Sequence, residues 1–360
     1  MKDSFHRRES DSTQGRFETL TVEWEEGVER PQEMRIYRET AKSILSRNES
    51  PDLPFRWSVN PYRGCAHACA YCYARHYHEY LGWGAGTDFD TRIVAKMNCP
   101  ELLDAEISKP SWKQEPLAFS GVTDCYQPAE RALGLTRQSL EVCLRRNTPV
   151  GMITKSSLIL RDLDVLGSLA RGPGATAVMS IPFDDPGDAK GMEPYASTPD
   201  SRFSTLEKLS AAGIRTGISI SPVIPGWNDS AIPRILERAK DCGAKFAFYV
   251  LLRLPGAVED VFIYRMREKF ADRVGKVEHH IRETHGGALK QAEFGTRMRG
   301  QGKMADMIED LFQLHAKKNG LEVGERMAGL VPETKAAKIP KAPETKPKSN
   351  VVQLGLFDDI

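Results

Sequence analysis

Three cysteines, Cys65, Cys69 and Cys72, lie within one short segment, Cys-Ala-His-Ala-Cys-Ala-Tyr-Cys. Thiolates are the ligands of iron–sulfur clusters, and a cubane cluster held by protein alone normally takes four of them. Three closely spaced cysteines therefore predict a [4Fe–4S] cluster with one iron left open. An open iron can hold a substrate or cofactor and pass it an electron, so this pattern indicates a chemical site.

A structural zinc site is the alternative for the same residues, with His67 or a remote cysteine as the fourth ligand. Zinc modules usually present their ligands as two separated pairs. The remaining cysteines offer no second closely spaced pair, since they stand at Cys99, Cys125, Cys143 and Cys242. The spacing favours the cluster.

Short apolar runs alternate with longer helical patterns after the N-terminal region, which is typical of parallel βα units. Helical stretches are expected at 131–144, 158–169 and 202–212. Six runs are short and apolar enough for strands covered on both faces, at 55–59, 117–120, 150–154, 175–180, 216–221 and 246–251. Six strands are fewer than the eight of a closed barrel, which predicts an α/β fold built as a partial, open βα barrel. The cysteines follow the first strand, where barrel active sites lie.

The composition divides the chain into four parts. Residues 1–54 form a polar N-terminal extension, with a helix expected at 32–45 after Pro31. Residues 55–260 form the barrel, and 261–328 form a helical region that packs beside it. Residues 329–360 are rich in proline and lysine, which predicts a disordered tail ending in an apolar peptide from Gln353 to Phe357.

The charge and composition of the whole chain limit the partners and the cellular location that can be expected. The formal net charge of the 360 residues is +1, so any nucleic-acid contact must depend on local basic patches. The odd cysteine count of seven and the polar N-terminus predict reduced thiols and a cytoplasmic location. The sequence contains no apolar run long enough to predict a membrane span.

The C-x3-C-x2-C spacing, with Tyr71 directly before the last cysteine, resembles the signature of the radical S-adenosylmethionine (SAM) superfamily. The resemblance covers residues 55–254 and extends to the branch that contains spore photoproduct lyase, a DNA-repair enzyme. It implies that SAM binds the open iron of a [4Fe–4S] cluster. It also implies that the reduced cluster cleaves SAM to a 5′-deoxyadenosyl radical, with flavodoxin or ferredoxin as the electron donor.

The resemblance assigns cofactor contacts to polar residues near the strand ends. Thr123 matches a hydroxyl that contacts SAM, and Lys155 matches a lysine that reaches the SAM carboxylate. Ser180 matches a serine near the ribose, and Ser221 matches a residue whose backbone lies along the adenine. Tyr71 completes this set of expected cofactor-binding residues.

One position departs from the lyase pattern. The lyase carries a hydrogen-donating cysteine where this sequence has Gly121. Cys125, four residues further on, is the catalytic candidate if its loop folds inward, and a buried, inert thiol is the alternative.

Weaker patterns also occur outside this set. Glu193 is expected to cap the helix at 202–212, with a contact to substrate or cofactor as the alternative. Arg297, Arg299 and Lys303 fit either a phosphate clamp or a solvated basic face. The peptide from Gln353 to Phe357 resembles the short motif by which repair and replication proteins dock on the DNA sliding clamp.

The leading hypothesis is a radical SAM enzyme that acts on nucleic acid in a repair-like reaction. The alternatives are radical SAM modification of RNA or a small molecule, and a non-enzymatic iron–sulfur redox sensor.

Overall fold

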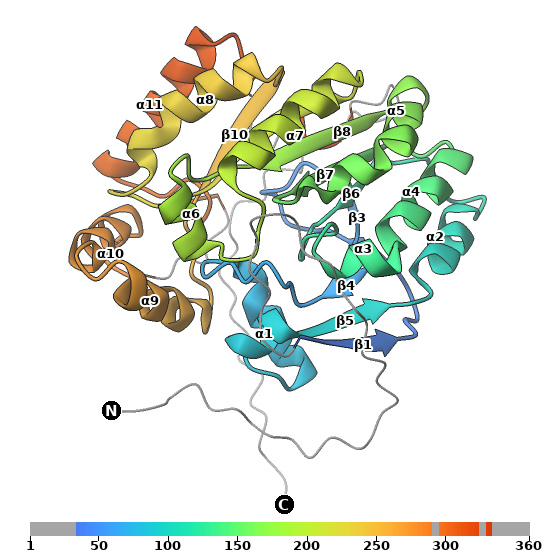
Figure 1. The fold of residues 1–360 in the computed structure, drawn as a ribbon, viewed down its shortest axis with the longest axis horizontal. Helices are drawn as coiled ribbons and strands as arrows, with labels where there is room; N and C mark the ends of the chain where they lie inside the picture. The colour runs from blue at the N-terminus through green and yellow to red at the C-terminus, as the bar shows by residue number, and fades with distance from the viewer. Residues whose placement is uncertain (1–33, 290–294, 324–328, 333–360) are drawn as a thin grey trace, which may run out of the picture.

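The computed structural model describes residues 34–289, 295–323 and 329–332, and its main sheet confirms the predicted partial barrel (Figure 1). The sheet has seven strands in the order β10-β9-β8-β7-β6-β3-β2. Six of these strands are parallel: β3 (Trp57–Val59), β6 (Leu117–Phe119), β7 (Val150–Thr154), β8 (Ala175–Ser180), β9 (Arg215–Val223) and β10 (Phe246–Leu251). Strand β2 (Leu45–Arg47) pairs antiparallel with β3 at one edge.

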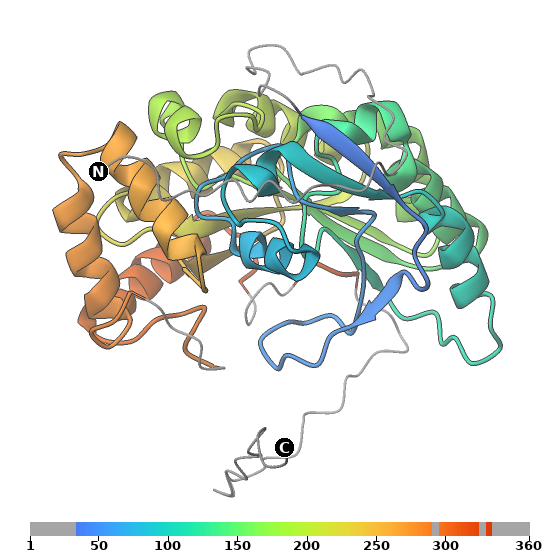
Figure 2. The same ribbon diagram turned by 90° about the horizontal axis from the view of Figure 1, so that it is seen from below.

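Helices cover the outer side of this sheet (Figures 1 and 2). Leucines from successive helices are fully buried against apolar strand residues, as Leu140, Leu166 and Leu236 show. Burial of such side chains drives the packing of helix on sheet. The helices of this layer are α2 (Cys99–Ile107), α4 (Leu135–Arg145), α5 (Leu163–Arg171), α7 (Pro199–Ala211), α8 (Ile232–Asp241) and α11 (Lys303–Lys318).

The helix boundaries differ from the predicted ones for local reasons. The helix expected at 131–144 is split into α3 (Ala129–Leu133) and α4, because Gly134 has a left-handed φ of 64° that an α-helix cannot contain. The helix expected at 158–169 begins as the 3-10 helix η2 (Ser157–Asp162) and continues as α5. Helix α7 starts at Pro199, where the Thr198 side chain accepts a hydrogen bond from the Ser201 amide.

The helix predicted at 32–45 is wrong. This segment contains β1 (Arg35–Glu39), which pairs parallel with β5 (Arg92–Lys96), and it ends at the start of β2. Strand β4 (Tyr62–Arg63) pairs with the other side of β5 and completes a second, three-stranded sheet. The partner of β1 lies more than fifty residues away, so local periodicity did not reveal it. Residues 34–54 thus belong to the folded body, and position 54 is no boundary between structural units.

The region after the barrel contains α9 (Val258–Lys269) and α10 (Val274–Thr284), followed by α11, which packs against α8. Residues 329–332 pack on the barrel, although a disordered tail was expected to begin at 329. Leu330 is buried, and a Cβ built on Gly151 would clash with the Leu330 carbonyl oxygen. The peptide from Gln353 to Phe357 lies outside the described residues.

Four shorter elements complete the described part of the chain. They are η1 (Tyr73–Leu81), α1 (Thr87–Thr91), α6 (Pro186–Met192) and η3 (Asp229–Ala231).

Among the residues that the structure describes, no helix has the length and apolar character that crossing a membrane requires.

Candidate active site

The cysteine loop lies between β4 and η1, and tight turns hold its thiols. The Ala68 amide donates to the Cys65 carbonyl, and the Cys72 amide donates to the Cys69 carbonyl, each over 3.2 Å. Cys65 and Cys69 are buried, whereas Cys72 is half-buried. The loop therefore brings three cysteines together and leaves one side of the group near the surface.

The cysteine loop offers ligands for either an iron–sulfur cluster or a single metal ion. A zinc ion with Zn–S bonds of about 2.3 Å would hold its thiolates within about 4 Å of one another. In the described part of the chain, three metal-ligating side chains have all their ligand atoms within 4.8 Å of one another only at His279, His280 and Glu283. The sulfurs of Cys65, Cys69 and Cys72 are not gathered that closely. Three thiolates are suitable donors for a [4Fe–4S] cluster.

The surroundings of the loop disfavour the charged form of its thiols. Burial raises the pKa of all three, and the carboxylates of Asp124 and Glu193 raise the pKa of Cys65 and Cys69, respectively, further. Because iron binds thiolates, a cluster held here would take the place of the protons on these sulfurs.

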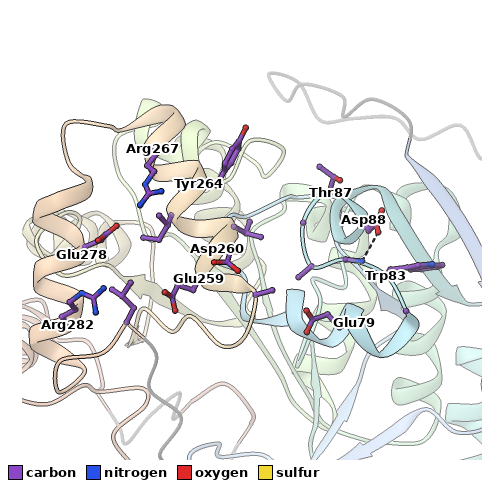
Figure 3. A pocket seen from close by; sticks show the side chains of 18 residues that line it. Glu79, Trp83, Thr87, Asp88, Glu259, Asp260, Tyr264, Arg267, Glu278 and Arg282 are labelled. Carbon is purple, nitrogen blue, oxygen red and sulfur yellow. Dashed lines mark hydrogen bonds between the residues drawn. The ribbon is translucent and has the colours of Figure 1, made fainter. Parts of the chain in front are cut away.

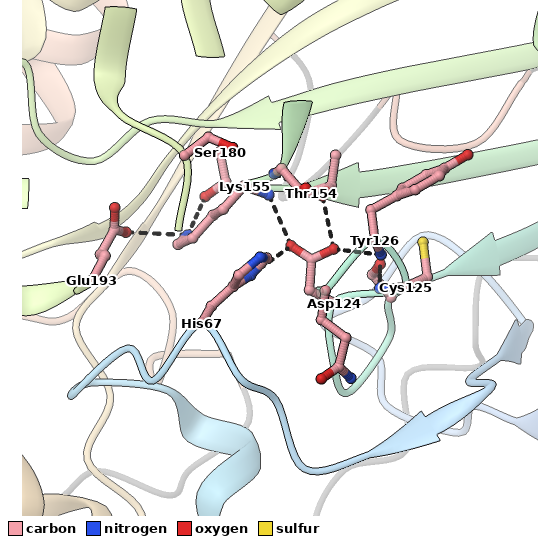
Figure 4. Close-up of polar contacts among 12 residues, drawn as sticks. His67, Asp124, Cys125, Tyr126, Thr154, Lys155, Ser180 and Glu193 are labelled. Carbon is pink, nitrogen blue, oxygen red and sulfur yellow. Dashed lines mark hydrogen bonds and ion pairs between the residues drawn. The ribbon is translucent and has the colours of Figure 1, made fainter. Parts of the chain in front are cut away.

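Lys155, directly after β7, faces the cysteine loop from the strand ends (Figure 4). Its Nζ donates to the Ser180 hydroxyl over 2.6 Å and to the Ser221 carbonyl over 3.4 Å, and it lies 5.6 Å from the centre of the Tyr71 ring. Four of the five residues predicted to bind the cofactor, Tyr71, Lys155, Ser180 and Ser221, thus converge. Burial lowers the pKa of Lys155 to about 8, with neighbouring Cys69 opposing that shift.

Glu193 joins this group, although it was expected to cap a helix. Thr198 caps α7 instead, while Glu193 is buried and lies 3.6 Å from Lys155 Nζ. Its carboxylate also accepts hydrogen bonds from the Tyr71 hydroxyl and, over 2.5 Å, from buried Arg202. Burial raises the pKa of Glu193 and Arg202 opposes the rise. Glu193 was only a weak candidate from the sequence pattern, and Arg202 was not a candidate, because its partner becomes visible only once the chain is folded.

Asp124, in the loop after β6, forms hydrogen bonds to the end of β7 (Figure 4). Its carboxylate accepts from the Thr154 hydroxyl over 2.7 Å and from the Lys155 amide over 2.8 Å, and it lies 3.4 Å from His67 Nδ1. Burial alone would raise its pKa, but His67 and these donors hold the pKa of Asp124 below its usual value. His67 was assigned no role from the sequence, and here it links the cysteine loop to the ends of β6 and β7.

Two predicted residues stand apart from this group. The Thr123 hydroxyl donates to the Tyr62 carbonyl over 2.9 Å, so its hydrogen bond serves the backbone. Cys125 is completely buried in the main apolar core, and its sulfur points away from His67 and Lys155 (Figure 4). The inward fold of the loop, on which a catalytic role for Cys125 depended, is not the one observed.

Gly121 occupies a crowded position at the end of β6. A Cβ built there would lie 3.1 Å from Ser58 Cβ, so a larger side chain would require Ser58 to shift. The Tyr73 hydroxyl donates to the Gly121 carbonyl over 2.6 Å. The packing around position 121 therefore favours the glycine that replaces the cysteine of the lyase pattern.

A separate cleft of about 890 Å³ lies between the loop after η1 and helices α9 and α10 (Figure 3). None of the predicted site residues lines it. Carboxylates outnumber guanidinium groups among its lining residues, which include Glu79, Asp88, Glu259, Asp260, Glu278, Arg267 and Arg282.

The arginines of the proposed phosphate clamp have protein partners. Arg297 pairs with buried Asp52 over 2.7 Å, and Arg299 pairs with Glu309 over 3.0 Å. These pairs give both arginines a structural role.

Comparison with known proteins identifies the family. The sequence model of the Radical SAM superfamily matches residues 59–239, half of the chain, and the protein belongs to that superfamily. Its members use a [4Fe–4S] cluster and SAM, and the cysteine loop and the Lys155 group described above suit these two cofactors.

Sequence relatives occur in bacteria, archaea and phages. An uncharacterized protein of Mycobacterium tuberculosis is 35% identical over 225 residues, which cover 62% of this chain and 66% of the relative, just under two thirds of its length. One of Methanocaldococcus jannaschii is 29% identical and covers 54% of this chain and 70% of the relative. A radical SAM Nα-GlyT isomerase of Pseudomonas phage M6 is 25% identical over 236 residues, 64% of this chain and 47% of the isomerase.

The fold is similar to that of solved spore photoproduct lyase structures. The lyase complexed with dinucleoside spore photoproduct superposes with a TM-score of 0.59 at 14% identity, covering 80% of this chain and 81% of that chain. A lyase variant with bound AdoMet and the same dinucleoside gives a TM-score of 0.58. At this identity the similarity establishes the shared fold.

Proposed function

We propose that this protein is a radical SAM enzyme that abstracts a hydrogen atom from a nucleic acid, in a reaction related to DNA repair. The observation that carries the proposal is the convergence of the cysteine loop and the Lys155 group on the carboxyl ends of the strands. The lyase that shares the fold has been solved with AdoMet and a dinucleoside lesion, which supports a nucleic-acid substrate.

The residues of this chain have distinct tasks in the proposed reaction. Cys65, Cys69 and Cys72 would hold the [4Fe–4S] cluster, which with SAM supplies a 5′-deoxyadenosyl radical. The Lys155 ammonium would pair with the SAM carboxylate, since an opposite charge in a buried site binds strongly. Glu193 and Arg202 keep Tyr71 and Lys155 in place through the contacts described above.

The hydrogen-atom source for product formation is expected to differ from that of the lyase. Gly121 carries no thiol, and Cys125 faces the core. We therefore expect substitution of Cys125 by serine to leave the yield of altered substrate per 5′-deoxyadenosine within twofold of wild type. A loss of more than tenfold in that ratio, in a Cys125→Ser protein with full iron content, would restore the catalytic role of Cys125.

Isotope transfer tests the substrate class. The reconstituted, reduced enzyme is incubated with SAM and perdeuterated DNA, either untreated or ultraviolet-irradiated, and in parallel with perdeuterated RNA. Deuterium in the 5′-deoxyadenosine, measured by mass spectrometry, shows abstraction from the polymer. Label from DNA supports the repair-like reaction, and label from RNA alone moves the activity to RNA. Unlabelled 5′-deoxyadenosine from every polymer contradicts a nucleic-acid substrate.

A sliding clamp is the proposed docking partner of the peptide from Gln353 to Phe357. The proposal rests on the similarity of that peptide to clamp-docking motifs. Deletion of residues 353–360 is expected to abolish binding to purified clamp in surface plasmon resonance. A Leu354→Ala, Phe357→Ala variant should behave like the deletion, and unchanged binding by both variants would remove the clamp from the account.

A further inference from the structure

Exposed tyrosines are concentrated on η1, the helix that follows the cysteine loop. Six large apolar side chains are exposed in the described part of the chain, and three of them, Tyr73, Tyr77 and Tyr80, belong to this helix. Their exposed fractions are 38%, 43% and 82%. Isolated exposed aromatic residues are common, but three on one short helix beside an active site indicate a binding surface.

The rings form a continuous surface, which we call the aromatic strip and define as His76, Tyr77 and Tyr80. A 3-10 helix has three residues per turn, so Tyr77 and Tyr80 lie on the same side of η1. Their ring centres are 6.3 Å apart with the planes at 26°, and the His76 ring lies 3.9 Å from the Tyr77 ring. None of the three lines the acidic cleft of Figure 3, to which η1 contributes Glu79.

The aromatic strip lies close to the proposed active site, because the residues on both sides of it contact the strand ends or the loops that follow them. Tyr73, the first residue of η1, donates its hydroxyl hydrogen bond to Gly121 at the end of β6. On the other side, a Cβ built on Gly256 would lie 3.6 Å from His76 Cβ, so the loop after β10 lies against the strip. A ligand on the strip would therefore lie next to the carboxyl ends of the strands.

That loop also supplies a cation, Arg253, with a buried donor that has no acceptor. Arg253 stands two residues beyond β10 and is half-buried. Its Nε is buried without a hydrogen-bond partner. Burial lowers the pKa of Arg253, and Arg297 lowers it further, while Tyr73, Tyr77 and the Asp52 carboxylate oppose the shift. Asp52 itself pairs with Arg297 over 2.7 Å. A buried donor without an acceptor is costly, so a phosphate oxygen that accepted from Nε would stabilise this arrangement.

We propose that Arg253 and the aromatic strip bind a single-stranded or locally unstacked nucleic acid. Arg253 would pair with a backbone phosphate, and bases would stack on Tyr77 and Tyr80. The bases of an intact duplex have no free faces for such stacking, whereas every unpaired base has one. This inference rests on the proposed nucleic-acid substrate and specifies its form.

Binding of fluorescein-labelled oligonucleotides to the reconstituted full-length protein tests the proposal by fluorescence anisotropy. The Tyr77→Ala, Tyr80→Ala double variant should lose at least tenfold in affinity for a single strand, because each base–aromatic stack contributes strongly. Tyr77→Phe, Tyr80→Phe should stay within twofold, since phenylalanine keeps the ring. Arg253→Gln should weaken binding and reduce the slope of log affinity against log salt by about one unit, and Arg253→Lys should restore the slope.

The controls separate this inference from the proposed function. Tyr264→Ala removes a tyrosine with 56% exposure on α9 and should bind like wild type. Equal affinity of wild type for single strand and duplex overturns the inference, as does unchanged binding by the double alanine variant. If that variant binds nucleic acid normally but accepts electrons more slowly from flavodoxin, the strip is a docking surface for the donor. The deuterium transfer described above reports on the substrate class independently of these variants.

Discussion

The two ends of the partial barrel bury different kinds of side chain. At the carboxyl ends of the strands, buried Glu193 pairs with buried Arg202 and with half-buried Lys155. Toward the amino ends, the interior is closed by an apolar cluster that includes Phe55, Phe246 and Leu330. Buried charges are costly unless they are paired, whereas apolar burial is favourable by itself. The paired charges therefore mark the end of the barrel where chemistry is expected, and the apolar end provides stability.

Among substitutions that test this contrast between the two ends, loss of a cluster cysteine should reduce activity the most. Cys69→Ala is expected to abolish the visible absorption of the cluster and all formation of 5′-deoxyadenosine, because two thiolates cannot retain the cluster. Iron content and mass spectrometry measure both. Cys242→Ala, a half-buried thiol on the helix side, is the matched control and should keep full iron content. A Cys69→Ala protein with a full cluster would contradict the assignment of the site.

Loss of the lysine charge should have the next largest effect. Lys155→Met is expected to weaken SAM binding roughly 10- to 100-fold, the range of a charge-assisted contact of about 1.5–3 kcal/mol. Equilibrium dialysis of the anaerobic protein against labelled SAM measures it. Lys245→Met removes an exposed lysine just before β10, at the opposite end of the barrel, and should not change the affinity. Equal losses from both substitutions would mean that the two ends are not functionally distinct.

A change of pH should alter the affinity for SAM less than the Lys155→Met substitution does. The Lys155 pKa of about 8 keeps the ammonium charged below that pH, so affinity should be constant there and fall by up to tenfold per unit above it. Without SAM, the unfolded chain holds this proton more tightly between pH 8 and the ordinary lysine value of 10.5, so the stability of the SAM-free fold should rise across that window. Calorimetric titration of wild type and Lys155→Arg tests the binding curve. Arginine stays charged, and an unchanged fall in that variant would assign the titration to another group.

A substitution at the apolar end should affect stability and leave the chemistry intact. Leu330→Ala removes a buried side chain and is expected to lower the free energy of unfolding by about 2–4 kcal/mol. Urea denaturation measures this loss. Formation of 5′-deoxyadenosine per folded molecule should match wild type at low temperature. Equal stability would show that residues 329–332 do not close the barrel, and reduced activity per folded molecule would couple the two ends.

Sequence alone predicted the parts of the fold that depend on local pattern. The six parallel strands are apolar runs, and the bounds of β7, β8 and β10 agree with the prediction because burial on both faces leaves a continuous apolar signal. Strand β1 was missed because its partner β5 is remote in sequence. Ile36 is the one buried residue of its five, so the segment also carries no apolar run.

The candidate site was predicted where residues follow a strand or a motif. Lys155, Ser180 and Ser221 lie at strand ends, which converge in any parallel barrel. The Glu193–Arg202 pair was not predictable, because two charged residues nine positions apart look like a solvated helix start until the fold buries both. Cys125 illustrates the opposite case. A cysteine near the motif suggested chemistry, but the direction of a side chain after a strand depends on packing that the sequence does not display.

Reductive cleavage of SAM tests the central claim most directly. The anaerobically reconstituted protein is reduced with dithionite, supplied with SAM and analysed for 5′-deoxyadenosine by mass spectrometry, beside Cys69→Ala and Lys155→Met. We predict 5′-deoxyadenosine from wild type, a reduced yield at limiting SAM from Lys155→Met, and none from Cys69→Ala. A wild-type protein that carries a complete, reduced [4Fe–4S] cluster and still forms no 5′-deoxyadenosine would contradict the account.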